Sequence, residues 1–269
     1  MTGPHRTEHE ARSPRFFLCS DSHHLATVAA DRVQTALAGT SNPTLLVATG
    51  KTPRGLYAEL AARRSSLAWG PDTQLFALDE YLGIAPDHPQ SFRTELLDSL
   101  ISPLGLRPDQ LHTPQGNCAD PEAESVRYEN QLADAGYAEL AIVGVGRNGH
   151  VAFNEPGTSF DSSTHVAQLT RDTREANASP SQSPGWPPSQ AITVGIGTLL
   201  RSRSILVLAD GAHKSRAIAA LGTPGSSEQW PISALWRHPD VSVCVDYAAG
   251  SALGELDESG HPIHTRDDL

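Results

Sequence analysis

The chain has 269 residues, a formal net charge of −11 and three cysteines. Its length suits one large α/β domain that buries a full core without disulfides or a structural metal. The acidic balance argues against nucleic acid or an anionic membrane as partner, because either needs a basic face. Widely spaced cysteines, with no secretory leader or long apolar run, make a cytoplasmic location the expectation.

The first part of the chain is expected to alternate strands and helices. Residues 1–14 are polar and lack periodicity, which indicates a flexible N-terminal arm. A strand at 16–19, an alanine-rich helix at 24–37 and a strand at 44–48 follow. This order is a βαβ unit, so we expect a single α/β catalytic domain over 15–252. The acidic residues 253–269 are expected to form a peripheral tail.

A glycine turn follows the second strand and consists of Thr49, Gly50, Lys51 and Thr52. A helical pattern begins at this turn, and a helix N-terminus presents free backbone amides and a positive dipole end. The spacing of a P-loop is absent. We therefore favour phosphate binding by this turn over a plain connection between strand and helix.

A third strand, at 74–78, is followed directly by two acidic residues, Asp79 and Glu80. A carboxylate at the end of an apolar strand can serve as a general base whose pKa is set by desolvation and hydrogen bonds. A carboxylate at this place can equally cap the segment that follows. The sequence leaves both interpretations open.

The central motif lies after a helical region at 98–135, with a helix expected at 122–132. An apolar run at 140–145 predicts a buried strand, and a glycine-rich loop follows it. In open parallel sheets ligands bind beyond the carboxyl ends of the strands. Asn148, His150 and Glu155 fall there and are candidates for the chemistry.

The same loop contains Gly144-x-Gly146-x-x-Gly149, which in isolation suggests dinucleotide binding. That fingerprint needs a helix that opens at the last glycine and an acidic residue further on. Pro156 and Gly157 break the segment almost at once. We therefore interpret the glycines as allowing close approach of the backbone to a substrate.

The last third begins with a proline-rich stretch at 169–190, which excludes a continuous helix and is equally compatible with a lid or a surface excursion. Buried segments are expected at 191–197 and 204–209. Lys214 lies just past the second of them and opens a helix at 215–221. Such a lysine is usually only solvated, but beside a phosphate it would supply a point charge. A strand at 241–246 closes the sheet.

Four blocks in order carry more information than any single motif. They are Ala48-Thr-Gly-Lys-Thr-Pro53, Leu78-Asp-Glu-Tyr-Leu-Gly83 with Asp87-His-Pro-Gln-Ser91, Gly144-Val-Gly-Arg-Asn-Gly-His-Val-Ala-Phe-Asn-Glu-Pro-Gly157, and Thr193-Val-Gly-Ile-Gly-Thr198 with Lys214. Together they resemble the isomerising glucosamine-6-phosphate deaminases, over about residues 16–250.

The resemblance implies an α/β fold with a doubly wound, mostly parallel sheet and helices on both faces, Rossmann-like and of the sugar-phosphate isomerase type. It implies conversion of glucosamine 6-phosphate to fructose 6-phosphate and ammonia, with no cofactor and no metal. Asp79 matches the base that moves a proton between C2 and C1. His150 matches the histidine that assists ring opening, oriented by Glu155 and the residue at position 148. An aldose–ketose shift needs such a pair of proton handlers.

Three departures from the family pattern carry predictions. Position 148 is Asn where the best-known members have Asp, so we expect an Asn148–His150 contact that orients the ring and leaves it less basic. Near Ser179 the phosphate-binding arginine of the family is missing, and we expect Lys51 to replace its charge. The positions that bind an allosteric activator in regulated members are His165 and Ala167, so we expect no activation by N-acetylglucosamine 6-phosphate.

Several alternatives remain open. One is a lactonase of the 6-phosphogluconolactonase type, although Phe153-Asn-Glu-Pro156 is atypical of that class. Others are a deaminase or isomerase for another amino-sugar phosphate, and a sensor that binds without turnover. A metal site of His88, His165 and His150 is disfavoured, because no ligand spacing supports it. The sequence does not distinguish a monomer from a homo-oligomer.

Overall fold

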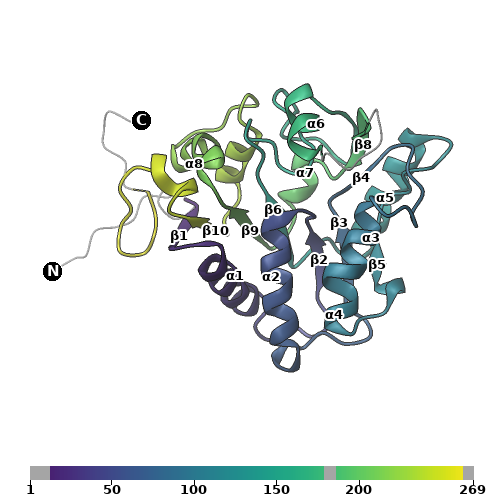
Figure 1. Ribbon diagram of the computed structural model, residues 1–269, viewed down its shortest axis with the longest axis horizontal. Coiled ribbons are helices and arrows are strands. Elements are labelled where there is room, and N and C mark those ends of the chain that lie inside the picture. The colour runs from purple at the N-terminus through teal and green to yellow at the C-terminus, as the bar shows by residue number, and fades with distance from the viewer. Residues whose placement is uncertain (1–12, 179–185, 263–269) are drawn as a thin grey trace.

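A seven-stranded parallel sheet forms the centre of the molecule. The computed structural model describes residues 13–178 and 186–262. The strand order is β1-β10-β9-β6-β2-β3-β5, and every neighbouring pair is parallel. Figure 1 shows this sheet crossing the view from β1 on the left to β5 on the right. The strands are β1 Arg15–Cys19, β2 Thr44–Val47, β3 Gln74–Ala77, β5 Leu111–His112, β6 Leu140–Gly144, β9 Ser204–Ala209 and β10 Val241–Asp246.

Helices cover both faces of the sheet, with α1 and α2 below it in Figure 1 and α8 above it. The helices are α1 Ser22–Ala36, α2 Lys51–Ala62, α3 Phe92–Leu96, α4 Ser102–Leu104, α5 Pro121–Asp134, α6 Arg171–Asn177, α7 Ile196–Leu199 and α8 Ser215–Gly222. A π-helical turn, Leu97–Ile101, joins α3 to α4, and a 3-10 helix, Pro231–Arg237, precedes β10. Within the described residues, no helix has the length and apolar character needed to cross a membrane.

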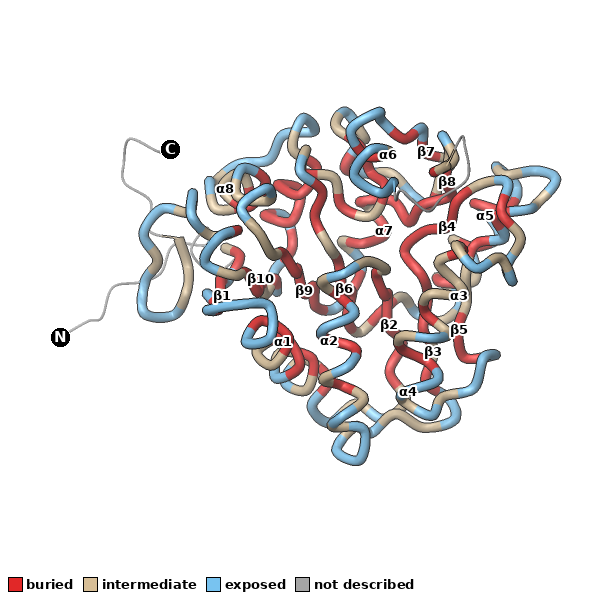
Figure 2. Tube along the Cα trace, in the orientation of Figure 1, coloured by how far each residue is buried: buried red, intermediate tan, exposed pale blue. Residues whose placement is uncertain are grey.

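Two hydrophobic cores lie on opposite faces of the sheet because successive strand residues point to opposite sides. Leu45 and Val47 pack with α1 and α2, whereas Leu46 between them packs with α5 and α8. Leu206 and Val207 divide between the two cores in the same way. Each fully buried leucine contributes about 1.5–3 kcal/mol. Figure 2 shows the result, with buried strands inside and exposed segments around them. The doubly wound α/β prediction is confirmed.

A small antiparallel sheet stands at the carboxyl edge of the large one. Its order is β4-β8-β7, with β4 Asp79–Tyr81, β8 Gln190–Thr193 and β7 His165–Gln168. One residue, Leu78, separates β3 from β4, so the chain passes directly from the parallel sheet into the small one. The sequence predicted a buried segment at 191–197 but gave no sign of this second sheet.

The stretch interpreted as a lid, 169–190, contains more regular structure than its composition suggests. Thr170 caps α6 by accepting a hydrogen bond from the Thr173 N–H, and the prolines all follow that helix. Residues 179–185 lie outside the described part of the chain, as do 1–12 of the predicted arm and 263–269 of the predicted tail. The described part of the tail reaches β1, where Gly260 O accepts the Phe16 N–H at 2.7 Å.

Candidate active site

The predicted site residues follow four neighbouring strands, β9, β6, β2 and β3, at the edge where all four end. The loops after β2 and β9 meet across β6, because the Thr52 hydroxyl donates to Asp210 Oδ1 at 2.6 Å. The loop after β6 reaches the small sheet, because the Phe153 N–H donates to Thr193 Oγ1 at 3.0 Å. Thr193 is paired with Asp79 between β8 and β4. The structure therefore brings the predicted residues to one edge of the sheet.

The glycine turn after β2 has the geometry of a helix N-terminus. Gly50, the residue before α2, has φ +113°, a conformation that favours glycine. Its N–H does not face open space, because it donates to Glu95 Oε1 at 2.8 Å. Glu95 also forms an ion pair with Arg54 at 3.1 Å. The predicted cradle is thus reduced to the N–H groups of Lys51 and Thr52, which have no acceptor within the helix, and to the exposed Lys51 ammonium.

Lys214 lies between the ends of β6 and β9. Its Nζ donates to Val145 O at 2.6 Å. Burial lowers the pKa of Lys214, while the nearby Asp210 carboxylate acts in the opposite direction. Since Asp210 also binds Thr52, the lysine and the glycine turn are connected through one carboxylate. This places a cation beside the helix N-terminus, as expected of a phosphate site.

Asp79 and Glu80 are both buried, but their surroundings differ. Glu80 accepts hydrogen bonds from the N–H groups of Tyr81, Phe92 and Arg93 at 2.9, 3.2 and 3.1 Å. Glu80 therefore caps the N-terminus of α3, which is the capping role that the sequence left open for this pair of carboxylates. Burial nevertheless raises the pKa of Glu80 to about 7, against the effect of those donors.

Asp79 accepts no hydrogen bond from the residues the structure describes, and its pKa lies well above the usual range. Burial is the largest cause, followed by the nearby carboxylates Glu80 and Glu95. A carboxylate without donors and with a raised pKa is a stronger base than one in water. Of the two carboxylates, Asp79 is therefore the candidate for the general base.

His150 packs against the backbone of its own loop, where a Cβ at Gly146 would overlap its ring. Its side chain is only 15% exposed. Burial lowers the pKa of His150 to about 4, with Lys214 acting in the same direction and Glu155 and Asp172 against it. The ring is therefore neutral at physiological pH and available as a proton acceptor.

The predicted contact between Asn148 and His150 is present, but it is made with the His150 backbone and not with the ring. Asn148 Oδ1 accepts the backbone N–H of His150 at 3.3 Å, and Asn148 Nδ2 donates to Glu155 Oε2 at 2.7 Å. The amide thus orients Glu155 and the loop backbone, because an amide group can donate to a carboxylate while it accepts from an N–H. The lowered pKa of His150 agrees in direction with the prediction, but its largest cause is burial.

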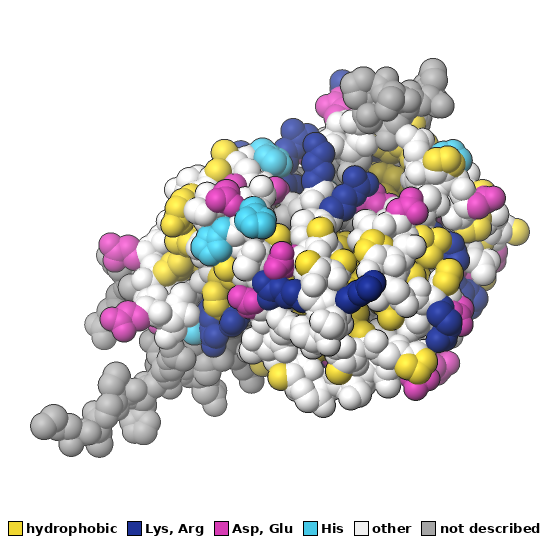
Figure 3. Space-filling view, turned by 60° about the horizontal axis from the view of Figure 1, so that its bottom comes forward, with side chains coloured by type: hydrophobic (Ala, Val, Ile, Leu, Met, Phe, Trp, Pro, Cys, Tyr) yellow, Lys and Arg dark blue, Asp and Glu magenta, His cyan; other side chains and the backbone are white. Residues whose placement is uncertain are grey.

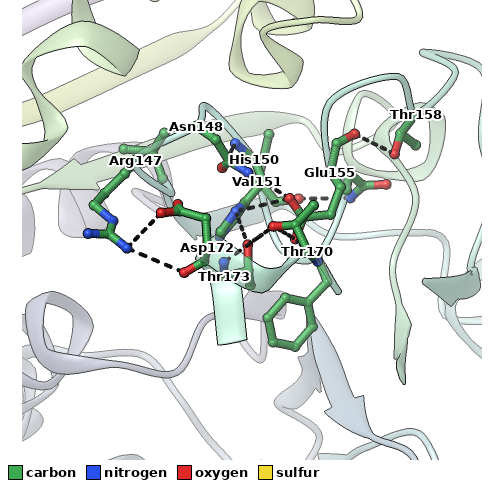
Figure 4. Close-up of polar contacts among 12 residues, drawn as sticks. Arg147, Asn148, His150, Val151, Glu155, Thr158, Thr170, Asp172 and Thr173 are labelled. Atoms are coloured by element: carbon green, nitrogen blue, oxygen red, sulfur yellow. Dashed lines mark hydrogen bonds and ion pairs between the residues drawn. The ribbon is translucent and has the colours of Figure 1, made fainter. Parts of the chain in front are cut away.

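The loop is fastened to the start of α6 by side chains that the sequence gave no reason to select. Glu155 Oε1 accepts both the N–H and the hydroxyl of Thr170, at 3.1 and 3.2 Å. The Thr173 hydroxyl lies 3.3 Å from His150 Nδ1, and Arg147 forms an ion pair with Asp172 at 2.9 Å. Figure 4 shows these side chains pointing toward one another across the loop and α6. Thr170 is the N-cap of α6, and a threonine is common at that position for reasons of helix capping alone.

An aromatic cluster lines the small sheet beside this network. The rings of Tyr81, Phe92 and Phe153 lie within 5.9 Å of one another. Trp186 meets Tyr81 edge-on at 5.4 Å. Phe153 also approaches the His150 ring, at 6.4 Å between centroids. The cluster makes one wall of the site apolar, which favours the neutral forms of the nearby titratable groups.

The other histidines are bound locally. His88 Nδ1 accepts the Gln90 N–H at 3.1 Å, and His165 Nδ1 lies 2.8 Å from Ser163 O. Within residues 13–178 and 186–262, no group of three or more His, Cys, Asp or Glu side chains is arranged to hold a metal ion. Figure 3 shows Lys and Arg side chains gathered at the upper middle of one face, so cationic character is local despite the net charge of −11. Ser179 lies outside the described residues.

Known proteins are similar to this chain over most of its length. Residues 20–244 match the family described as glucosamine-6-phosphate isomerases/6-phosphogluconolactonase. The glucosamine-6-phosphate deaminase of Exiguobacterium sp. is 37% identical over 235 residues, 87% of this chain and 90% of the relative. A solved monomeric glucosamine-6-phosphate deaminase has a TM-score of 0.84 and 36% identity, covering 88% of this chain and 99% of its own. The 6-phosphogluconolactonase from Trypanosoma cruzi shares the fold, with a TM-score of 0.70, 19% identity and coverage of 92% and 99%.

Proposed function

The chain belongs to the family of glucosamine-6-phosphate isomerases and 6-phosphogluconolactonases, and on that premise we propose that it is a glucosamine-6-phosphate deaminase. It converts glucosamine 6-phosphate to fructose 6-phosphate and ammonia. The sequence similarity to deaminases, at 37% and 36% identity, supports this activity. The lactonases, at 19% identity, share only the fold.

The observation that carries the proposal is the pairing of two different proton handlers at one edge of the sheet. Asp79 is a buried carboxylate that accepts no hydrogen bond from the described residues, and His150 is a neutral imidazole whose side chain is mostly buried. A reaction that opens a pyranose ring and then moves a carbon-bound proton needs one group of each kind. A protein that only bound the sugar would need neither.

The phosphate provides binding energy that holds the sugar in place. The N-terminus of α2 and the ammonium groups of Lys214 and Lys51 are the groups suited to hold it. Asp210 keeps Lys214 and Thr52 together, since it binds the Thr52 hydroxyl and opposes the lowering of the Lys214 pKa. The sugar ring then extends from this end of the site toward Asp79 and His150.

His150 acts first, on the closed ring. As a neutral imidazole it accepts the proton of the anomeric hydroxyl and returns a proton to the ring oxygen, so that the C1–O5 bond breaks and an aldehyde forms at C1. Asp79 then removes the proton from C2 while one proton of the C2 ammonium group passes to the C1 oxygen, which gives an enolamine. Asp79 delivers its proton to C1. The product is an imine at C2, which water hydrolyses to the ketone and ammonia.

A direct test measures ammonia and fructose 6-phosphate released from glucosamine 6-phosphate, beside a panel of other amino-sugar phosphates and 6-phosphogluconolactone. We expect both products in equal amounts from glucosamine 6-phosphate. Acid release from the lactone alone would identify a lactonase. A much larger kcat/KM for another amino-sugar phosphate would move the assignment to that substrate. Such compounds belong in the panel because positions 148 and 179, here Asn148 and Ser179, depart from the family pattern. Binding without turnover would indicate a sensor.

A further inference from the structure

The carboxylate of Glu155 does not reach the His150 ring directly. Glu155 Oε2 lies 3.8 Å from His150 Nδ1, beyond the reach of a hydrogen bond. The Asn148 side chain binds Glu155 and the His150 backbone rather than the ring. The group that does reach Nδ1 is the hydroxyl of Thr173, at 3.3 Å.

A continuous path of hydroxyl groups joins the ring to the carboxylate. From His150 Nδ1 it runs to Thr173 Oγ1 at 3.3 Å, to Thr170 Oγ1 at 3.1 Å, and to Glu155 Oε1 at 3.2 Å. Thr173 is fully buried, so water does not compete for its hydroxyl. Thr170 is the N-cap of α6 and Thr173 lies in its first turn, where the Thr173 N–H donates to Thr170 Oγ1 at 3.2 Å. The helix cap therefore fixes the distance between the two hydroxyls.

The carboxylate determines the direction of every proton along this path. An ionised Glu155 can only accept, so Thr170 donates its single hydroxyl proton to Glu155. The Thr170 hydroxyl lies within donating distance of both Glu155 Oε1 and Thr173 Oγ1 but has only one proton, which the negative carboxylate takes. Thr170 Oγ1 then accepts from Thr173, through both the N–H and the hydroxyl of that residue. Thr173 Oγ1 then has no proton left for the ring and must accept one from it. If the protons pointed the other way along the path, Thr170 would donate to Thr173. Thr170 Oγ1 and Glu155 Oε1 would then lie 3.2 Å apart with no proton between them.

We propose that Thr170 and Thr173 are positioning residues that hold neutral His150 as the Nδ1–H tautomer, with the lone pair of Nε2 directed to the substrate. Ring opening requires this tautomer, because Nε2 must accept the proton of the anomeric hydroxyl. The inference rests on the proposed function for its catalytic meaning, whereas the tautomer itself is a property of the free protein. A group that fixes the tautomer of a catalytic histidine also fixes its orientation.

The charged groups around the ring are compatible with this arrangement. Glu155 belongs to the same loop, Asp172 to α6, and Lys214 follows β9. Arg147 acts on Lys214 and is itself paired with Asp172. Burial keeps the ring neutral, since it lowers the pKa of His150 to about 4. Two tautomers exist only for a neutral ring, so the two hydroxyls have an effect throughout the physiological range.

The test compares Thr173→Val, which removes the hydroxyl at nearly constant shape, with Thr173→Ser, which retains it. Thr158→Val is the matched control, because the Thr158 hydroxyl donates to the main-chain oxygen of Glu155 at 2.7 Å and lies outside the path. Histidine labelled with ¹⁵N reports the tautomer of His150 in each free protein, and the deaminase assay reports kcat and KM.

We expect the Nδ1–H tautomer in the wild type, in Thr173→Ser and in Thr158→Val. In Thr173→Val we expect a mixture of tautomers or the Nε2–H form. We expect kcat to fall by about tenfold or more with little change in KM. This loss should stay below the ~10⁴-fold loss seen in a serine protease when Asn replaces the Asp that orients the catalytic histidine. If Thr173→Val fails to fold, Thr173→Ala removes the same hydroxyl without added bulk.

An Nε2–H tautomer in the wild type would overturn the proposal without any variant. An unchanged tautomer and unchanged kcat in Thr173→Val would also overturn it. A wild type that releases no ammonia, yet changes tautomer on Thr173→Val, would refute the proposed function and leave the two threonines in their positioning role.

Discussion

The site contains two regions that control a proton in opposite ways. At the start of β4, Asp79 is buried among carboxylates and accepts no hydrogen bond from the described residues. In the loop after β6, His150 is surrounded by partners on its backbone and on Nδ1. Desolvation makes the first group a strong base, whereas hydrogen bonds orient the second. The difference matches the two steps, since taking a proton from carbon needs base strength and ring opening needs placement.

The largest expected effect is loss of the base in the first region. Asp79→Asn keeps the shape of the side chain but cannot accept the C2 proton, so we expect kcat to fall by about 10³-fold or more. Removal of a buried negative charge should leave the fold intact. Steady-state kinetics and thermal unfolding check both statements. Retention of a substantial part of wild-type kcat would end the assignment of Asp79 as base.

The residue next to the base should behave as a structural group. Glu80→Gln leaves one acceptor oxygen for the three N–H groups of Tyr81, Phe92 and Arg93, and we expect a loss of about 1–3 kcal/mol in the free energy of unfolding. Denaturant unfolding measures it, with the exposed Glu122→Gln as control. A kcat loss as large as that of Asp79→Asn, without loss of stability, would reverse the roles of the two residues.

The same carboxylate should make stability depend on pH. The folded-state pKa of Glu80 is about 7 against an ordinary value of 4.5. A raised folded-state pKa means that its contribution to stability is fully present below 4.5 and is lost as pH rises through about 7. We expect the free energy of unfolding to fall over this window in the wild type and to fall less in Glu80→Gln. Equal slopes in the two proteins would remove Glu80 as the cause.

The second region can be altered through Asn148. In Asn148→Asp a second carboxylate faces Glu155, at a site where the amide now donates at 2.7 Å. The added negative charge should raise the pKa of His150 above its value of about 4, by about one unit or more. An NMR titration of the ring measures this, with Asn148→Ser as the neutral control. A pKa that does not rise would show that burial alone sets it.

The smallest effect is expected at the edge of the phosphate site. Lys51 is exposed, so Lys51→Ala should raise KM by about two- to fivefold, the size of an exposed ion pair, with kcat unchanged. Lys214→Ala should raise KM more, because Lys214 is partly buried and donates to Val145 O. Unchanged KM in Lys51→Ala would remove the idea that this residue replaces the arginine missing near Ser179.

The sequence predicted the parts of the fold that depend on local pattern. The apolar runs at 204–209 and 241–246 coincide with β9 and β10, because strands buried on both faces are continuously apolar. It did not predict β4, which has three residues and begins with two acids. The proline-rich composition at 179–188 also concealed α6, which ends before those prolines.

Sequence pattern alone gave the positions of the candidate site residues, and only the family resemblance gave them roles. The carboxyl ends of parallel strands identified Asp79, His150, Glu155 and Lys214. Asp79 and Glu80 could not be told apart, because the donors that occupy Glu80 come partly from residues 92 and 93. Thr173 could not be selected at all, since its contact with His150 spans 23 residues and depends on how α6 meets the loop.

The central claim is that Asp79 moves the carbon-bound proton and His150 only opens the ring. The reverse reaction of fructose 6-phosphate with ammonium in D₂O measures the proton transfer assigned to Asp79 separately from ring opening. The open-chain form of fructose 6-phosphate arises without the enzyme, so this reaction does not need His150 to open a ring. We predict deuterium at C1 with the wild type, most of that exchange with His150→Gln, and none with Asp79→Asn. Exchange that survives in Asp79→Asn, or that disappears as completely in His150→Gln, would contradict this division between the two regions.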